Sequence, residues 1–589
     1  MILLRKLAFV LIACAFANCT SSNKKNNFNS IQETQSLSGD WAFLASNEIS
    51  EEEILKENYS NWDTLQVPGN WDTQKKYSEY VGKGYYQKTF TIPKNWKEKQ
   101  IRLKFNAVYE TSKVWLNGEL LGEHIGGYTP FEFNISKKIN LDAPNSIVVM
   151  ANNTYKRGAW WAWGGISRDV SLIANNDVRI VYQHITSEPD FNNQIVNFTI
   201  KYKIENNGNT VATASILSEI GDIHKDSIKI NVAKETTAVS YIKFKKPLKE
   251  VKLWDFNNPN LYNLKSSVLI NKDIVATATD KFGIRKFEVK GEQFYLNNEA
   301  VRMNGINRVH DHPNYGNTEP DHLVLQDMLD IKSLGCNFSR LMHAPLSKNL
   351  LKVCDSIGFL LVEEIPVWGD DDPQSYPNNP LTKKWMKDMI ERDYNHPSVV
   401  AWSVGNELRE NDSIAATWPE KKMTKNQYEY ANSMLDYVKE LDPSRLKTYV
   451  TITSYRKGEV GSEPYEKVDF ISMNTYGKAV ELAKKTHEKF PGKPIFISEI
   501  GKGQIGPAPE GKLTDELVAY LKELKQYPWI TGVSLWSYND YRSNYRGTPE
   551  SGFREWGIVD EKRNKKEAYK QLKEVYDYWL TKPLPHSKH

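Results

Sequence analysis

The chain has 589 residues, a length that predicts three or four domains at about 100–200 residues each. Its hydrophobic fraction of 40% and charged fraction of 25% are typical of packed proteins and argue against general disorder. The formal net charge is only +4, which argues against a dedicated nucleic-acid binder. The aromatic fraction of 12% fits large β-rich cores, and it also fits flat faces that stack on sugar rings.

The N-terminus carries a targeting signal. Residues 1–19 contain Arg5 and Lys6 followed by an apolar stretch that is too short for a permanent membrane span. A cysteine that closes this stretch resembles a bacterial lipoprotein signal, with Cys19 as the lipidated residue and Cys14 as the alternative. A plain cleaved signal with incidental cysteines is the other interpretation. We expect an exported protein, anchored by lipid on the periplasmic or outer surface, or else soluble in the periplasm.

The segment after the signal, residues 20–36, is rich in Ser, Asn and Lys and is predicted to be a flexible tether. From 37 to 176, short alternating apolar runs between Gly, Asn and Pro predict a β jelly-roll sandwich. A second β-rich stretch, 177–286, predicts an immunoglobulin-like β-sandwich without a catalytic-looking cluster. The four cysteines of the chain are too few for a disulfide framework in any of these domains.

From residue 287 to 589, apolar strands alternate with amphipathic helices. Repeated βα units over about 250–300 residues predict a (β/α)₈ TIM barrel. An open doubly wound sheet is the alternative, although the Gly-rich phosphate loop typical of that fold is absent from the sequence.

Two predicted barrel strands end in glutamate. Val399–Val404 leads to Glu407, and Pro494–Ser498 leads to Glu499. At about thirty residues per βα unit, their spacing places them on strands 4 and 7, which face each other across the barrel mouth. Two facing carboxylates are the equipment of glycoside hydrolysis, and their separation decides between retention and inversion. Two unrelated surface glutamates are the structural alternative.

Residues at neighbouring strand ends extend this candidate site. Asn406 is placed to bind a sugar hydroxyl, while Tyr476 and Arg340 are placed to hold Glu499 ionised and oriented. Trp536 is either a platform for a sugar ring or a buried structural side chain. Other tryptophans expected near the barrel mouth are Trp160, Trp161, Trp163, Trp368 and Trp556.

The motifs KVWLNGELLGEHIGGYTPFEF, SRLMHAP, RDYNHPSVVAWSVGNE and PIFISEIG resemble glycoside hydrolase family 2, the family of β-galactosidases and β-glucuronidases. The resemblance covers nearly the whole mature chain. It implies a retaining double displacement with Glu407 as acid/base and Glu499 as nucleophile. It also implies substrate contacts at His310, Asp311 and His343, although GINRVHDHP departs from the usual residue order of the family.

The resemblance leaves the sugar open. The Glu-x-His metal segment of long β-galactosidases is absent after LLVEE, so we predict no essential metal and no cofactor. The Asn-x-Lys pair that grips the uronate in many β-glucuronidases is also absent before Gly557. Loop 540–556 instead carries Arg542, Arg546 and Arg554, which are candidates to bind an acidic sugar and are otherwise solvated loop charges.

The predicted activity is exo-hydrolysis of terminal β-linked sugars from polysaccharide-derived oligosaccharides. A β-glucuronidase is the first expectation, and a β-galactosidase is the alternative. A non-catalytic carbohydrate-binding protein and a transglycosylase are competing interpretations, and the sequence does not predict an oligomeric state.

Overall fold

The computed structural model describes residues 31–57, 59–371, 379–410, 422–452, 464–501 and 503–581. The predicted signal, with Cys14 and Cys19, lies outside the described residues. Among the described helices, none has the length and apolar character needed to cross a bilayer.

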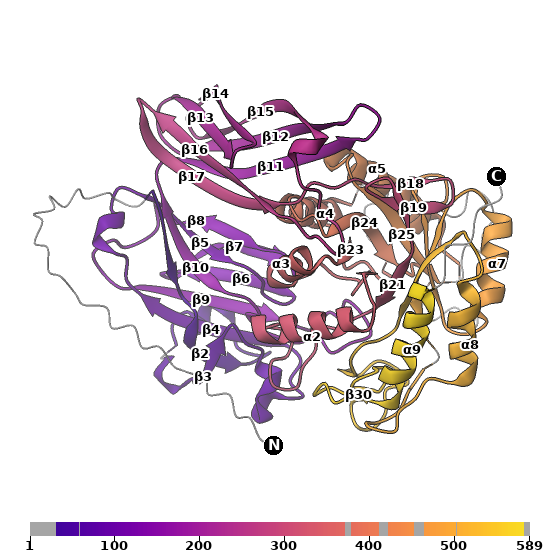
Figure 1. The fold of residues 1–589 in the computed structure, drawn as a ribbon. Helices are drawn as coiled ribbons and strands as arrows, with labels where there is room; N and C mark the ends of the chain where they lie inside the picture. Colours follow the sequence, from indigo (N-terminus) through magenta and orange to yellow (C-terminus); the bar gives the residue numbers. More distant parts are fainter. Residues whose placement is uncertain are drawn as a thin grey trace, which may run out of the picture. The chain divides into compact units, whose positions relative to one another are not determined.

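The first domain is a sandwich of two antiparallel sheets (Figure 1). One sheet has the order β1-β10-β5-β8, with bounds Gln32–Ser36, Val170–Asn175, Gln100–Phe105 and Phe131–Asn134. The other has the order β3-β2-β4-β9-β6-β7, with bounds Asp63–Val67, Gly39–Ala45, Lys83–Phe90, Asn145–Asn152, Thr111–Leu116 and Glu119–Ile125. A short helix α1, Glu51–Ile54, lies between β2 and β3.

The tether prediction is wrong at its C-terminal end. Strand β1 pairs with β10 from Gln32↔Asn175 to Ser36↔Ser171, so the sandwich already includes these residues. Backbone pairing to a strand about 140 residues later overrides a composition that by itself is typical of a flexible linker. Only the part of the predicted tether before residue 31 lies outside the described residues.

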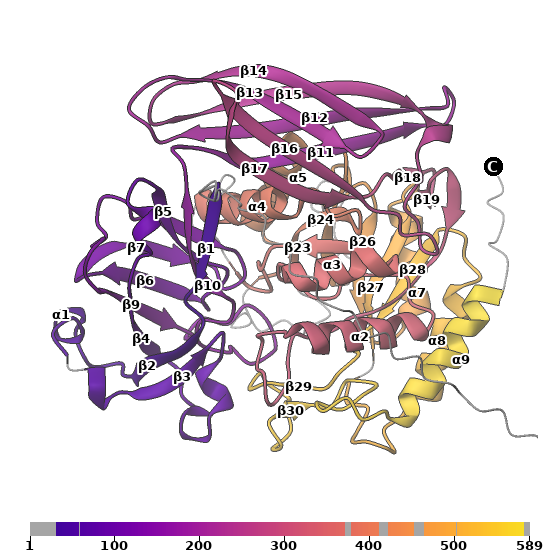
Figure 2. The same ribbon diagram turned by 60° about the vertical axis from the view of Figure 1, so that its left-hand side comes forward.

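The second domain has two antiparallel sheets of long strands, shown in Figure 2. Sheet β11-β12-β15 has bounds Val178–Asp190, Ile195–Asn206 and Thr236–Pro247. Sheet β14-β13-β16-β17 has bounds His224–Val232, Ala212–Ile220, Tyr262–Ile270 and Asp273–Phe282. Strict alternation of buried and half-exposed residues along β12 places one face of each sheet in a common core. The predicted immunoglobulin-like sandwich is confirmed.

A small antiparallel sheet leads into the barrel, with β18, β19 and β20 at Phe287–Lys290, Gln293–Leu296 and Glu299–Val301. The eight parallel strands β21 to β28 follow at Met303–Ile306, Phe338–Ser339, Leu360–Glu364, Val399–Asn406, Leu446–Ile452, Ile471–Thr475, Ile495–Ile500 and Ile530–Leu535. A two-stranded ribbon, β29 and β30, pairs Tyr541–Arg542 with Phe553–Arg554.

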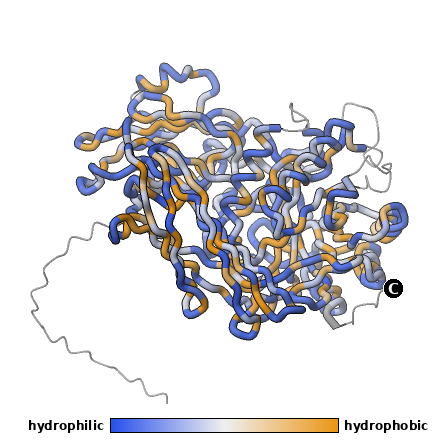
Figure 3. Tube along the Cα trace, turned by 90° about the horizontal axis from the view of Figure 1, so that it is seen from above, coloured by the Kyte–Doolittle hydropathy of each residue, from blue (hydrophilic) through white to orange (hydrophobic). Residues whose placement is uncertain are grey.

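The helices that cover the barrel follow its strands. They are α2, α3, α4, α5, α7, α8 and α9, at Asp321–Ser333, Lys348–Ile357, Pro380–Asp393, Lys425–Leu441, Ala479–Lys489, Asp515–Leu524 and Glu567–Thr581. Short 3-10 turns elsewhere occur at Tyr59–Asn61, Trp71–Thr73, Lys75–Tyr77, Lys94–Trp96 and Leu248–Glu250. Apolar and polar stretches alternate along the whole trace (Figure 3), as expected for elements that bury one face.

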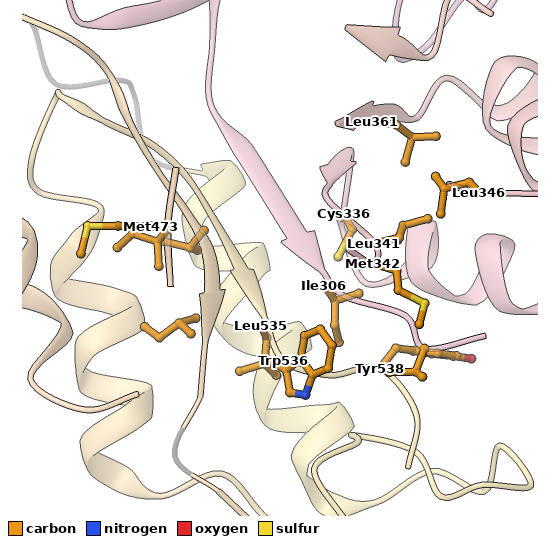
Figure 4. Packing of buried hydrophobic residues seen from close by; sticks show 14 of the residues in the cluster. Ile306, Cys336, Leu341, Met342, Leu346, Leu361, Met473, Leu535, Trp536 and Tyr538 are labelled. Atoms are coloured by element: carbon orange, nitrogen blue, oxygen red, sulfur yellow. The ribbon is translucent and has the colours of Figure 1, made fainter. Parts of the chain in front are cut away.

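The barrel closes between its first two strands. The Asn337 amide donates to the Asn304 carbonyl at 3.0 Å, and the Arg308 amide donates to the Leu341 carbonyl at 3.0 Å. These bonds exclude the open doubly wound alternative and confirm the predicted TIM barrel. Figure 4 shows Ile306 and Leu535 packing beside Trp536 at the carboxyl ends of β21 and β28. These side chains belong to the large apolar cluster that packs the barrel strands against the surrounding helices.

Candidate active site

A cavity of about 290 Å³ opens at the carboxyl ends of the barrel strands. Glu407 directly follows β24, the fourth barrel strand, and Glu499 lies in β27, the seventh, so the predicted placement is confirmed. The cavity is lined by Ala159, His343, Trp368, Asn406, Glu407, Tyr476, Glu499, Trp536, Tyr541, Tyr545, Arg546, Arg554 and Trp556. Both carboxyls therefore face one open cavity of a size suited to a small ligand.

Glu499 is held by a cation and a hydroxyl. Arg340, fully buried on the loop after β22, and the Tyr476 hydroxyl both donate hydrogen bonds to its carboxylate. Arg340 is fixed in turn, since its Nη1 donates to Glu364 at 3.3 Å and its Nη2 lies 3.4 Å from Asn406 Oδ1. The predicted partnership of Arg340 and Tyr476 with Glu499 is confirmed.

Glu407 is held differently. Asn474 Nδ2 donates to Glu407 Oε1 at 2.8 Å and to Asn406 Oδ1 at 3.1 Å, while Ser498 Oγ donates to Asn474 Oδ1 at 2.8 Å. The sequence interpretation missed Asn474. Its position two residues before Tyr476, at the end of β26, was the available signal, because alternate strand residues share a face.

Burial raises the pKa of both carboxyls. The Glu407 charge raises the pKa of Glu499 further, whereas Arg340 and the Tyr476 hydroxyl lower it. Once Glu407 holds a proton, that repulsion disappears and the two donors stabilise the Glu499 anion. The two carboxyls are therefore coupled, and protonation of one favours ionisation of the other.

Aromatic rings form much of the cavity wall. Trp368, Trp536 and Trp556 line it as expected, together with Tyr541 and Tyr545, which the sequence interpretation missed. Trp536 lines the cavity, is 5% exposed and donates from Nε1 to the Tyr541 hydroxyl at 3.0 Å. Its ring is therefore a buried side chain with one part at the cavity wall.

The three loop arginines have different positions. Arg546 and Arg554 line the cavity, and the Arg554 guanidinium lies 4.8 Å from the centre of the Trp556 ring. Arg542 does not line it, which corrects that prediction. Its guanidinium lies 3.8 Å from the Trp161 ring and donates to Glu79 at 2.7 Å, because the ribbon turns this side chain toward the jelly roll.

The histidine segment also differs from the prediction. His343 lines the cavity with both ring nitrogens buried and without a hydrogen-bond partner among the described residues. His310 and Asp311 are buried outside the lining, so they are not direct contacts in this cavity. Asp311 accepts from Trp163 Nε1 at 2.6 Å and therefore anchors the jelly roll to the barrel mouth.

The jelly-roll segment 158–164 supplies one edge of the cavity through Ala159. Its tryptophans are buried behind that edge: Trp160 packs 4.4 Å from the His343 ring, and Trp161 Nε1 donates to Asp72 at 2.8 Å. Ser543 Oγ on the ribbon donates to the Ala159 carbonyl at 2.7 Å. Two domains therefore build this edge together.

Within the described ranges, no three His, Cys, Asp or Glu side chains are grouped to hold a metal ion. The chemistry that the described residues can perform is acid/base and nucleophilic catalysis by the two glutamates.

Family comparisons agree with this geometry. The sugar-binding domain of glycosyl hydrolases family 2 matches residues 34–176, a further family 2 domain matches 178–285, and the family 2 TIM barrel domain matches 287–578. The chain belongs to glycoside hydrolase family 2. Membership makes it a β-glycosidase that acts on carbohydrate.

The relatives and structural neighbours of this family 2 glycosidase carry different names. A putative β-glucuronidase of Formosa agariphila is 27% identical over 98% of this chain and 74% of its own length. A β-galactosidase of Thermoanaerobacter pseudethanolicus is 28% identical over 86% of this chain and 66% of its own length. The crystal structure of a Bacteroides uniformis β-glucuronidase superposes with a TM-score of 0.82 at 25% identity, over 92% of this chain and 69% of that one.

Proposed function

We propose that this family 2 glycosidase is an exo-acting, retaining enzyme that removes terminal β-linked uronic acids, with β-glucuronides as its preferred substrates. The observation that carries the proposal is the joint location of Glu407, Glu499 and Arg554 in one cavity of about 290 Å³. A cavity near the lower end of the usual range for ligand sites favours a single terminal sugar over the interior of a polymer.

The proposed reaction is a double displacement. The Glu499 carboxylate attacks the anomeric carbon while Glu407 gives its proton to the departing glycosidic oxygen. Glu407 then takes a proton from water, the water oxygen attacks the anomeric carbon, and the bond to Glu499 breaks. The Asn474 and Arg340 hydrogen bonds support this division of labour, since they hold the two carboxyls separately.

Hydrogen-bond donors support the choice of an acidic sugar. Arg554 Nε and Trp556 Nε1 are buried and have no hydrogen-bond partner in the described part of the chain, and both residues line the cavity. Buried donors without acceptors are costly, so a ligand that brings acceptors is favoured. A sugar carboxylate would replace the missing acceptors and pair with the Arg554 charge.

The relatives support the alternative of a β-galactosidase as well, because enzymes of both names match this chain at similar identity. Paired nitrophenyl β-glucuronide and β-galactoside assays decide between them. We expect a kcat/KM at least about tenfold higher on the glucuronide, as a charged hydrogen bond implies. A preference for the galactoside would overturn the uronate assignment, and no turnover of any β-glycoside would favour the carbohydrate-binding alternative.

Two variants sharpen this test. Arg554→Gln removes the charge, and we expect about a tenfold to hundredfold loss on the glucuronide with little change on the galactoside. Trp556→Phe removes the indole N–H together with part of the ring surface, so a loss of a few-fold, larger on the glucuronide than on the galactoside, is expected. Equal losses on both substrates would mean that these residues shape the cavity and do not recognise the sugar carboxylate.

We also propose that the protein is exported and lipid-anchored through Cys19. The proposal rests on the signal-like residues 1–19. Metabolic labelling with a radioactive fatty acid should mark the wild type and Cys14→Ser and leave Cys19→Ser unmarked. Labelling that depends on Cys14 would make Cys14 the lipidated residue in place of Cys19. An unlabelled wild type would support a plain cleaved signal.

A further inference from the structure

The outer face of sheet β11-β12-β15 carries a regular array of basic and aromatic side chains. Strand register places Lys203 between Tyr182 and Val239, and Lys201 between His184 and Tyr241. Lys243 is opposite Thr199, and Lys245 is opposite Asn197. We define the lysine–tyrosine face by residues Tyr182, Lys201, Lys203, Val239, Tyr241, Lys243 and Lys245.

The charges of this face lack acidic partners. No ion pair within the described residues includes Lys201, Lys203, Lys243 or Lys245, and the first two ammonium groups lie 5.9 and 5.7 Å from the Tyr182 ring centre. Neighbouring like charges on a sheet are unfavourable. In a chain whose net charge is only +4, this concentration of lysines is a local feature.

Protection of a sheet edge explains only some of the lysines on this face. Lysines on an edge strand discourage aggregation, and β15 is such a strand. Lys201 and Lys203, however, lie on β12, the central strand of this sheet, where no edge needs protection.

Of the two tyrosines of the face, Tyr241 is accessible and Tyr182 is held in place. Tyr241 and the neighbouring Val239 are 48% and 47% exposed. Tyr182 stacks on His184 at 3.9 Å between ring centres, and His184 stacks on Tyr394 of the barrel at 4.4 Å. This column fixes the Tyr182 ring at low entropic cost to a ligand that packs on it.

The face adjoins a cleft of about 600 Å³ between the second domain and the barrel. Thr186 and Asn197, which share rows with Lys243 and Lys245, line this cleft. The rest of the lining is mixed in charge, with Lys439 and Lys447 beside the acidic Glu188, Asp190, Glu288 and Asp469. The cleft borders the amino ends of β24 and β25, whereas the catalytic cavity lies at their carboxyl ends, and the two share no lining residue.

We propose that the lysine–tyrosine face binds a chain of uronic acids as a non-catalytic polysaccharide site. Repeated carboxylates complement the unpaired lysines, and sugar rings pack on Tyr182 and Tyr241. The tyrosine column favours a polysaccharide over an anionic membrane, which would need only the charges. Such a site holds the enzyme on its polymer while the opposite end of the barrel releases terminal sugars.

The test is affinity gel electrophoresis of the purified protein in polygalacturonate, with neutral dextran as the reference. We expect the wild type to be retarded by polygalacturonate and not by dextran. The triple variant K201S/K203S/K243S should bind at least about tenfold more weakly, and Tyr241→Ser, which keeps the charges, about threefold more weakly. All variants should keep wild-type turnover of nitrophenyl β-glycosides, which checks their folding and separates this proposal from the proposed function.

The matched control removes three exposed lysines from the other side of the same domain: Lys225, Lys229 and Lys234. It should bind polygalacturonate as the wild type does. The proposal is overturned if the wild type is not retarded, if the control loses as much affinity as the face variant, or if Tyr241→Ser binds normally. Stronger lysine-dependent binding to dextran sulfate, or to phosphatidylglycerol vesicles, would also overturn it and assign the face to a sulfated chain or a membrane.

Discussion

Two walls of the catalytic cavity are built on different principles. The wall formed by the strand ends holds Asn406, Glu407 and Glu499, all at most 6% exposed, and an internal hydrogen-bond network connects them. The wall formed by segment 540–556 holds Arg554 and Trp556, which are half-buried and carry donors without partners among the described residues.

Under the proposed function, the wall formed by the strand ends carries out the reaction, and the wall formed by segment 540–556 selects the substrate. Reacting groups need positions fixed to within a fraction of an ångström, which a closed sheet provides. Recognition groups need unsatisfied hydrogen bonds that only the right ligand completes, and a ribbon outside the sheet provides these at lower structural cost. Variants of the first wall should therefore damage turnover of every substrate, and variants of the second should change the preference among substrates.

The largest effects are expected at the two glutamates. Glu499→Gln should reduce kcat by about four orders of magnitude or more on both nitrophenyl substrates, because no nucleophile remains. Glu407→Gln should cost about 10²- to 10⁴-fold, and least for substrates whose leaving group needs no proton. Glu555→Gln, on the ribbon loop, is the control and should keep activity. A Glu499→Gln enzyme with near-normal turnover would disprove the assignment.

Arg340→Lys tests the network beneath the nucleophile. Lysine keeps the positive charge but cannot donate to Glu364, Asn406 and Glu499 at once as the guanidinium does. The value of kcat/KM should therefore fall about a hundredfold. Both the charge of Arg340 and its hydrogen bond lower the pKa of Glu499, so a lysine that keeps only the charge should raise that pKa. The nucleophile must be ionised, so the acidic limb of the pH profile should move to higher pH.

The matched control for this variant is Arg302→Lys, whose guanidinium donates to the Lys525 and Tyr527 carbonyls at 2.6 and 2.9 Å, away from the cavity. It should leave the pH profile unchanged. An unshifted acidic limb in Arg340→Lys would mean that the arginine has only a structural role.

Tyr476→Phe should have a smaller effect of the same kind. Loss of one hydroxyl donor to Glu499 is expected to cost about tenfold in kcat/KM and to shift the acidic limb upward. Tyr538→Phe removes a comparable hydroxyl, bound to Asp330 at 3.1 Å, and should change stability without changing the profile. Parallel profiles in the two variants would contradict the role of Tyr476.

The smallest effect on turnover is expected at Asp311, which accepts a hydrogen bond from Trp163 of segment 158–164. Its replacement should change stability measurably. Burial raises the pKa of Asp311 to about 7. The folded state therefore keeps a proton between about pH 4 and 7 that the unfolded state has lost, and the wild type loses stability as pH rises through that window. Asp311→Asn keeps an acceptor for Trp163 and does not titrate.

Thermal melts of the two proteins from pH 4 to 8 check this prediction. The free energy of unfolding of Asp311→Asn relative to the wild type should rise by up to about 4 kcal/mol as the pH rises to about 7. Above that pH the difference should stay constant. The difference between the proteins is the informative quantity, because buried histidines such as His310 have lowered pKa values and oppose the trend at acid pH. A constant difference would contradict a titrating Asp311.

Much of the site was predictable because strand ends and periodic patterns are local features. The apolar runs Val399–Val404 and Pro494–Ser498 lie between amphipathic helices, and this pattern predicted parallel strands. The spacing of Glu407 and Glu499 placed them on strands 4 and 7. Arg340 and Tyr476 were found in the same way. Asn474 was missed although it lies two residues before Tyr476, because its amide interacts with Glu407 on a different strand, a contact that only the assembled barrel creates.

The sequence by itself determined the three-domain order, the barrel and the two glutamates at its mouth, since hydrophobic periodicity and βα spacing carry that information. Only the tertiary structure decided which loop side chains reach the cavity. Arg542 and Arg554 lie on the same short ribbon, yet one packs on Trp161 of the jelly roll and the other faces the catalytic pair. Packing between domains far apart in the sequence sets those directions, and no local pattern records it.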